Sequence, residues 1–155
     1  MCIRDRDVVV NILTNLAYHN GKVKVLGGEQ MRPNIHIEDM VRAYLHVLTS
    51  APEKIQGEVF NVGYHNHTVM RLGQIVQEIV GKKRPVELVV EPTNDNRSYH
   101  VSSEKIAKKL GFEPKFSIEN AVEDLVEAFS SGKLPDALID TRYVNIKTMK
   151  ALNLQ

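Results

Sequence analysis

Apolar residues recur every three or four positions in several stretches of the chain, a spacing that gathers side chains on one face of a helix. Val9, Ile12 and Leu16 follow it between Asp7, a residue type that caps helices, and Gly21, one that ends them. The first predicted helix therefore covers residues 8–20. The same pattern predicts helices over 39–49 (capped by Asp39), 70–80, 102–110 (capped by Ser102), 117–130 (capped by Ser117) and, weakly, 145–152.

Other short stretches alternate apolar and polar residues or are largely apolar, as β-strands are. They predict strands over residues 22–27, 34–37, 58–63 and 86–90. In the second strand, Ile35 and Ile37 would lie on one face and His36 on the other. The helix after it carries an apolar face made of Val41, Tyr44, Leu45 and Leu48. Because predicted helices and short strands alternate along the chain, we predict one α/β unit, with strands too few and too short for a complete doubly wound sheet.

Composition narrows the class of protein. At 155 residues, with 43% hydrophobic and 25% charged residues, the chain has the size and make-up of one globular domain. Its 20 basic and 19 acidic residues are well mixed, which argues against nucleic acid as a partner. No apolar run reaches the roughly 18–20 residues of a membrane span, and the N-terminus lacks a signal-peptide core. A single cysteine, Cys2, fits a cytoplasmic location.

Signatures of cofactor, nucleophile and metal sites are missing from the chain. No Gly-x-Gly-x-x-Gly turn follows a strand, and there is no P-loop, no Gly-x-Ser-x-Gly and no His-Glu-x-x-His. His65 and His67 lack a third candidate ligand nearby. We therefore expect no cofactor-binding or metal-binding residues here.

Two four-residue matches imitate a catalytic Tyr-x-x-x-Lys pair. The chemistry of that pair needs both side chains on one helical face beside a nicotinamide. Gly21 interrupts the helix between Tyr18 and Lys22, and Tyr143 and Lys147 lie in the weakly patterned tail. We therefore predict no catalytic residue in the chain.

Arginine placement suggests an anion site instead. Pro33 holds Arg32 in an extended backbone at the mouth of a strand, where its guanidinium could grip a phosphate or pair with a nearby glutamate. In the stretch NDNRSYHVSSEKIAKKLGFEP (94–114), Asp95, Arg97 and Tyr99 occupy alternate positions of an extended segment. These three side chains can point the same way, toward a ribose, a phosphate and a sugar. The alternative is a polar loop with Tyr99 packed on the next helix.

The order of these stretches resembles a known family. RPNIHIEDMVRAYLHVL (32–48), GEVFNVG (57–63) and residues 95–129 are similar to the C-terminal half of extended short-chain dehydrogenase/reductases, the NAD-dependent sugar-nucleotide epimerases and dehydratases. The resemblance runs from about Arg6 to Phe129. It implies a partial Rossmann-type unit plus a small mixed α/β substrate-binding subdomain.

Site residues follow from the resemblance. It implies that Arg32 and Arg97 bind the diphosphate of a UDP- or dTDP-sugar, that Asp95 contacts the ribose and that Tyr99 approaches the sugar. The base would lie along the strand of Lys24, Val25 and Leu26. Leu26 stands where relatives often have an aromatic ring, a departure that argues against base stacking.

The implied function is that of the substrate-binding part of an NAD(P)-dependent epimerase or dehydratase, an isomerase or lyase. NAD or NADP would be bound only by the full-length parent, a homodimer, whose Rossmann half is the missing partner. Alone, this chain would be inactive. The alternatives are a stand-alone nucleotide-sugar-binding or assembly module, and the C-terminal half of a reductase acting on a non-nucleotide substrate.

Boundaries are predicted in the same way. Residues 1–6 have the character of a non-native or fragment-boundary leader, and residues 7–155 form one substrate-binding region. The predicted strands at 34–37, 58–62 and 86–90 would make an incomplete sheet. We expect apolar surface to be exposed where the missing half would dock.

Overall fold

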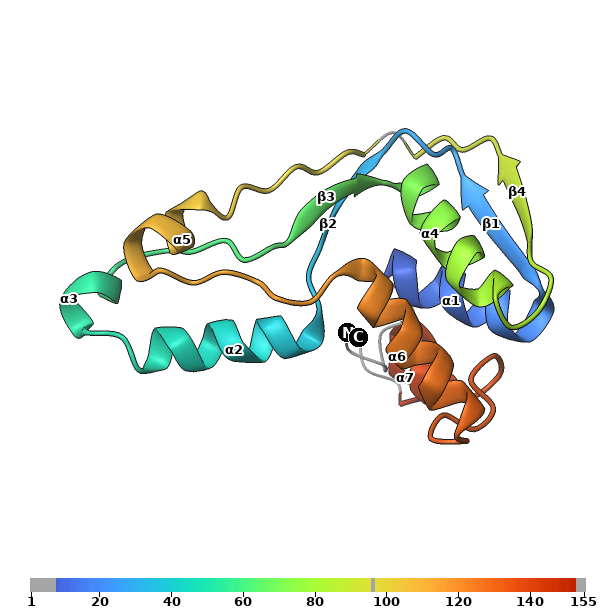
Figure 1. Ribbon diagram of the computed structural model, residues 1–155. Helices are drawn as coiled ribbons and strands as arrows, with labels where there is room; N and C mark the ends of the chain where they lie inside the picture. The colour runs from blue at the N-terminus through green and yellow to red at the C-terminus, as the bar shows by residue number, and fades with distance from the viewer. Residues whose placement is uncertain (1–7, 96, 153–155) are drawn as a thin grey trace.

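The computed structural model describes residues 8–95 and 97–152, and it shows an elongated molecule (Figure 1). The elements in chain order are α1 (Val9–Asn20), β1 (Lys22–Leu26), β2 (Met31–Asn34), α2 (Ile37–Leu48), α3 (Pro52–Ile55), β3 (His65–Thr68), α4 (Val69–Gly81), β4 (Glu87–Glu91), α5 (Glu104–Leu110), α6 (Ile118–Ser130), the 3-10 helix η1 (Thr141–Tyr143) and α7 (Asn145–Ala151). We call α1, β1, α4, β4 and α6 the compact end. We call α2, α3, residues 58–62 and α5 the arm. The mixed α/β class is as predicted.

The compact end is built on a parallel pair of strands. β1 and β4 pair in parallel from Lys22 opposite Glu87 onward. Because side chains alternate along a strand, Val23 and Val25 point inward and are fully buried, while Lys24 points outward and pairs with Glu91 at 2.6 Å. The strand thus has one face for the core and one for solvent or a ligand.

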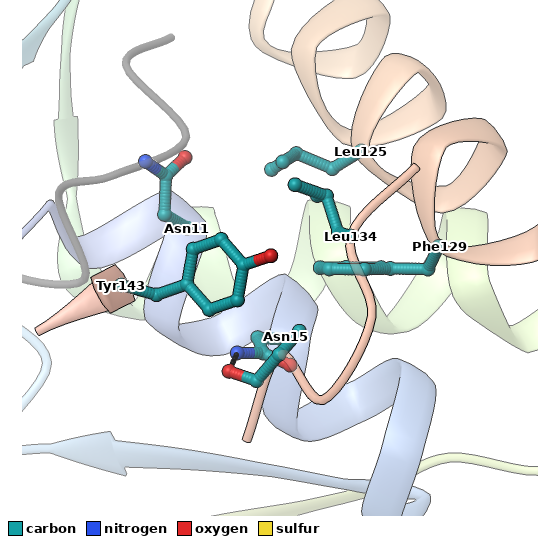
Figure 2. Close-up of a pocket in the computed structure, with 7 residues that line it drawn as sticks. Asn11, Asn15, Leu125, Phe129, Leu134 and Tyr143 are labelled. Atoms are coloured by element: carbon teal, nitrogen blue, oxygen red, sulfur yellow. Dashed lines mark hydrogen bonds between the residues drawn. The ribbon is translucent and has the colours of Figure 1, made fainter. Parts of the chain in front are cut away.

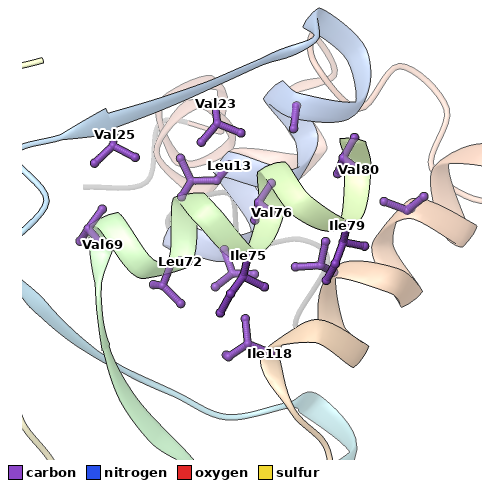
Figure 3. Close-up of a cluster of buried hydrophobic side chains, with 14 residues drawn as sticks. Leu13, Val23, Val25, Val69, Leu72, Ile75, Val76, Ile79, Val80 and Ile118 are labelled. Carbon is purple, nitrogen blue, oxygen red and sulfur yellow. The ribbon is translucent and has the colours of Figure 1, made fainter. Parts of the chain in front are cut away.

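Helices α1, α4 and α6 enclose the main core with this strand pair (Figure 3). Fourteen buried apolar residues form it, and Leu72 of α4 is among the fully buried ones. Gly73 lets α4 lie close to β1, because a Cβ at that position would be 2.6 Å from Val25 Cγ2. This core holds the strand and helices that shape the site described below.

The arm has a much smaller core. Among the described residues, its buried cluster consists of Ala43, Ile106 and Phe112, with partly buried neighbours around them. A buried carboxylate joins the arm to the chain that leads into α6. Asp39, fully buried, accepts hydrogen bonds from the backbone N–H groups of Lys115 at 2.9 Å and Phe116 at 2.8 Å, and it pairs with Arg42.

The predicted strand at 34–37 is wrong. The strand β2 lies earlier, at residues 31–34, and pairs in antiparallel fashion with β3, with Arg32 opposite His67. His36 then caps α2, since its Nδ1 accepts the backbone N–H of Glu38 at 3.2 Å. Asp39 is therefore inside the first turn rather than at the cap.

The predicted strand at 58–63 is also wrong, and β3 takes its place in a stretch predicted to be a loop. Residues 58–63 have neither helix nor strand, and no backbone–backbone hydrogen bond among the described residues involves 59–62. A strand needs a neighbouring strand to complete its hydrogen bonds, and none of the strands in the described residues pairs with this segment. The expected single incomplete sheet is instead two separate two-stranded sheets.

The remaining helices confirm the sequence patterns. The predicted helices at 8–20, 70–80 and 117–130 match α1, α4 and α6 within one residue at each end. Ser117 caps α6 in a reciprocal capping box with Asn120. Ser103, rather than Ser102, precedes α5, although the Ser102 hydroxyl accepts the N–H of Glu104 at 3.4 Å. The predicted cap Asp7 lies outside the described residues.

Candidate functional site: a pocket between α1, β1 and the 93–99 segment

A pocket of about 220 Å³ opens where α1, the outer face of β1, β2 and the start of α4 meet. Its apolar lining comes mainly from the helix and strand ends: Val9, Ile12, Leu13, Leu26 and Val69. Its polar lining consists of Lys24, Gln30, Arg32, Thr93 and Asp95. A largely apolar hollow with a few convergent polar groups is the usual form of a small-molecule site.

Arg32 occupies the polar side of this pocket. Its Nη1 donates to the carbonyl oxygens of Arg97 at 2.6 Å and Met31 at 2.9 Å. Its guanidinium carbon lies 5.4 Å from the centre of the Tyr99 ring, and its Nη2 lies 3.9 Å from Asp95 Oδ2. The arginine is therefore held by the 95–99 segment rather than by the neighbouring glutamates that the sequence offered as alternatives.

Asp95 and Arg97 form a two-pronged ion pair. Arg97 Nε and Nη2 donate to the two carboxylate oxygens at 2.7 and 2.8 Å, and the Arg97 backbone N–H donates to Oδ1 at 3.1 Å. These hydrogen bonds from Arg97 lower the pKa of Asp95 well below its usual range, and the charges of Arg97 and Arg32 lower it further. The same pair raises the pKa of Arg97.

The local charge balance favours an anion. Two guanidinium groups, of Arg32 and Arg97, surround one carboxylate, that of Asp95. Lys24 is neutralised by Glu91 at 2.6 Å. One positive charge is therefore left over beside the pocket, on side chains whose planar donors suit phosphate oxygens.

The structure brings together most of the residues that the sequence singled out. Arg32, Asp95, Lys24 and Leu26 line the pocket. Arg97 and Tyr99 do not line it but contact Arg32 from outside. Val25 is the exception, because it alternates inward along β1 and is fully buried in the core.

Sequence reasoning missed two groups of lining residues. Val9 and Ile12 were seen only as part of the apolar face of a helix, and that face, which includes Leu13, is divided between core and pocket. Gln30 and Thr93 carried no recognisable signal. Gln30 becomes visible only through its hydrogen bond to the Asp95 carbonyl oxygen, 65 residues away in sequence.

A second hollow, between α1 and the C-terminal tail, is too small for a substrate (Figure 2). Its volume is about 20 Å³, roughly the room for one water molecule. Asn15 Nδ2 donates to the carbonyl oxygen of Ala137 at 2.9 Å on its border, and the Tyr143 ring faces it. Tyr143 is thus in a structural contact between helix and tail.

Comparison with known proteins shows which family the chain resembles. Residues 4–63 match the model of the NAD dependent epimerase/dehydratase family. The chain is 30% identical to dTDP-glucose 4,6-dehydratase 1 of Escherichia coli K12 over 113 residues, which is 67% of this chain and 30% of the relative. It is 31% identical to a solved UDP-glucose 4-epimerase of Thermotoga maritima, with a TM-score of 0.64 over 81% of this chain and 40% of that one. These matches confirm the resemblance of the chain to the NAD-dependent epimerases and dehydratases of the extended short-chain dehydrogenase/reductase family.

Other solved structures share the fold at lower identity. UDP-glucuronic acid 4-epimerase from Bacillus cereus, solved with UDP-glucuronic acid and NAD, superimposes with a TM-score of 0.68 at 18% identity. The chain spans about 30% of the length of the curated relatives that it matches and about 40% of the solved ones.

Two further features describe the chain. Within residues 8–95 and 97–152, no group of three or more histidine, cysteine, aspartate or glutamate side chains is arranged to hold a metal ion. In the same residues, no helix has both the length and the apolar character needed to cross a membrane.

Proposed function

We propose that this chain is the substrate-binding part of an NAD(P)-dependent epimerase or dehydratase that acts on a nucleotide sugar. The observation that carries the proposal is the pocket in which an apolar wall from α1 and β1 meets Arg32 and the Asp95–Arg97 pair. An apolar wall suits a flat base, and paired arginines suit a diphosphate. Several relatives are named for sugars linked to UDP or dTDP.

Each side chain has a defined role in this proposal. Arg32 and Arg97 donate to the diphosphate, and such charge-assisted bonds contribute about 1.5–3 kcal/mol each. Asp95 contacts the ribose and Tyr99 approaches the sugar. Lys24 and Leu26 border the base, while buried Val25 has no contact with it.

Binding requires Arg97 to exchange partners. Without ligand, both prongs of its guanidinium are engaged by Asp95. A diphosphate offers the same planar donors more negative charge, so Arg97 turns from Asp95 to the phosphate. Asp95 is then free to accept a ribose hydroxyl.

The chain's own residues do not fit NAD. The sequence has no Gly-x-Gly-x-x-Gly turn, and at the Gly27–Gly28 turn a Cβ on Gly27 would lie 2.5 Å from Gln30 Nε2, so the side chain of Gln30 fills that space. We therefore place the cofactor and the catalytic residues in a separate NAD-binding part and expect this chain alone to be inactive. A cytoplasmic location and a homodimeric parent belong to the same proposal, the first from the single cysteine and the second from the family resemblance.

The arm presents a surface suited to that NAD-binding part. On α2, Tyr44, Leu45 and Leu48 are 66%, 57% and 77% exposed, and a hollow of about 310 Å³ lies between this helix and Phe60. Beside it, residues 59–62 make no backbone–backbone hydrogen bond among the described residues, although the Val59 carbonyl oxygen accepts a hydrogen bond from Lys105 Nζ at 2.8 Å. A partner that offers both an open strand edge and apolar side chains satisfies this surface. The sheet of an NAD-binding domain has both.

Titration with UDP and dTDP, followed by calorimetry, tests the substrate assignment. Arg32→Ala and Arg97→Ala should each weaken binding by about tenfold or more, a loss of roughly 1.4 kcal/mol. Arg142→Ala is a matched control, because Arg142 forms the same kind of pair with Asp140 two residues earlier and is equally exposed, at 72% of its side chain. Equal binding by all three variants and the parent chain would refute the phosphate roles.

A further inference from the structure

The segment that carries Asp95, Arg97 and Tyr99 has no regular secondary structure to hold it. Residues 92–103 contain neither helix nor strand among those described. Yet the pocket depends on this segment, since Arg32 contacts it at several points. The geometry of the anion site is therefore set by individual contacts: the backbone N–H of Tyr99 donates to the Met31 carbonyl oxygen at 3.1 Å, and the remaining contacts come from side chains that tether the segment.

Gln30 is such a tether, and it joins three parts of the site. Its Oε1 accepts the backbone N–H of Gly28 at 2.8 Å, and its Nε2 donates to the carbonyl oxygen of Asp95 at 2.8 Å. Its own carbonyl oxygen accepts the backbone N–H of Val69 at 3.0 Å, at the start of α4. One residue thus connects the β1–β2 turn, the 92–99 segment and α4.

Both ends of the amide are required. A backbone N–H on one side needs an acceptor, and a carbonyl oxygen on the other side needs a donor, so only one orientation of an amide serves both. Space is also restricted: Cβ atoms added to Gly27 would lie 2.5 Å from Gln30 Nε2 and 2.6 Å from Thr93 Cγ2. The side chain is packed into the turn and cannot be replaced by a different shape without moving it.

We propose that Gln30 is a positioning residue that sets Asp95 and Arg97 in the geometry that receives the diphosphate. The proposal rests on the proposed function of the pocket. Gln30 acts through the Asp95 carbonyl oxygen, so its effect on binding should pass through Arg97. It also borders the pocket itself, beside Arg32 and Leu26.

Gln30→Glu is the sharpest substitution. The carboxylate has nearly the same shape and can still accept from Gly28, but it cannot donate to the Asp95 carbonyl oxygen and repels it. Gln56→Glu adds the same charge at an exposed site at the end of α3, far from β1 (Figure 1). It controls for a general effect of one more negative charge.

The first measurement is the affinity for UDP in a double-mutant cycle with Arg97→Ala. Gln30→Glu should raise the Kd about tenfold in the parent chain and less than about threefold when Arg97 is already alanine, while Gln56→Glu changes nothing. A purely structural defect would weaken binding equally in both backgrounds. Equal effects, or no effect in the parent chain, would overturn the proposal.

The second measurement needs no ligand. Hydrogen–deuterium exchange at the backbone amides of Asp95, Arg97 and Tyr99 should be faster in Gln30→Glu than in the parent chain, with exchange in α6 unchanged. If UDP fails to bind the parent chain but exchange rises as expected, the proposed function fails and the tether stands. Unchanged exchange across 92–99 would refute the tether whatever UDP does.

Discussion

The two ends of the molecule differ in how much of their apolar surface and backbone hydrogen-bonding capacity is satisfied by contacts within the chain. The compact end buries fourteen apolar residues between three helices and a strand pair, whereas the buried cluster of the arm has three. The arm leaves the apolar row of α2 in solvent and residues 59–62 without backbone partners among the described residues. The compact end is therefore held mainly by its own buried contacts, whereas the arm keeps apolar surface that the proposed NAD-binding part would cover.

Removing a buried side chain from the main core should have the largest effect on the free energy of unfolding. Leu72→Ala removes a fully buried side chain between α4 and its neighbours, which should lower the free energy of unfolding by about 2–5 kcal/mol. Urea denaturation followed by circular dichroism measures this loss of stability.

Phe112→Ala is the counterpart in the buried cluster of the arm, and it should raise hydrogen exchange in α5 while leaving α4 protected. Global unfolding by Phe112→Ala would show that the two ends are one cooperative unit.

Removing the buried carboxylate that joins the arm to the chain leading into α6 should have the next largest effect on the free energy of unfolding. Asp39→Ala deletes the buried acceptor of the Lys115 and Phe116 backbone N–H groups and leaves Arg42 without its partner. A fully buried donor left unsatisfied costs about 1–3 kcal/mol; these two hydrogen bonds are partly buried, so we expect a total loss of that order. The unfolding midpoint in urea should fall accordingly. Asp124→Ala, which affects a largely exposed carboxylate paired with His36, should have a much smaller effect.

The exposed face of the arm should affect assembly more than stability. Replacing Leu45 and Leu48 together by lysine should change the free energy of unfolding by less than about 0.5 kcal/mol, because both side chains are already largely in solvent. It should also reduce self-association of the chain, measured by sedimentation velocity over a range of concentrations. A parent chain that is already monomeric throughout that range would favour a stand-alone module over the docking surface.

The smallest expected effect concerns the ion pairs that Lys105 and Lys109 of α5 form with Glu58. Hydrogen bonds from Lys105 and then Lys109 lower the pKa of Glu58 from its ordinary 4.5 to about 2. A lowered pKa means that the contact stabilises the fold above pH 4.5 and is lost as the pH falls toward 2. Glu58→Gln should therefore lower the Tm by about 1–2 °C at pH 7 and not at pH 2. A larger loss at pH 2 than at pH 7 would contradict the assignment.

The sequence predicted the compact end well because its signals are local. Helical spacing, capping residues and glycine stops determine α1, α4 and α6, and the alternation of residues 22–26 determines β1. In the arm the local pattern was misleading. Residues 58–63 have the alternation of a strand, but a strand forms only beside another strand. At His36, a side chain rarely used as a cap ended the extended segment, so the cap of α2 lies three residues before the predicted cap, Asp39.

The candidate site was predictable in part. The arginines, Asp95 and the outer face of β1 came from residue type, spacing and family resemblance, and the structure brings Arg32, Asp95, Lys24 and Leu26 to one pocket. Val25 was included because the whole strand was transferred, although alternation sends it to the core. Gln30 could not be predicted, since its importance rests on a contact between segments far apart in the chain.

The most direct test of the central claim compares UDP with uridine, and dTDP with thymidine, by isothermal titration calorimetry on the unmodified chain. If Arg32 and Arg97 receive a diphosphate, each nucleotide should bind at least about tenfold more tightly than its nucleoside, and added salt should reduce that difference. Equal affinities for nucleotide and nucleoside, or no binding of either nucleotide, would contradict the account.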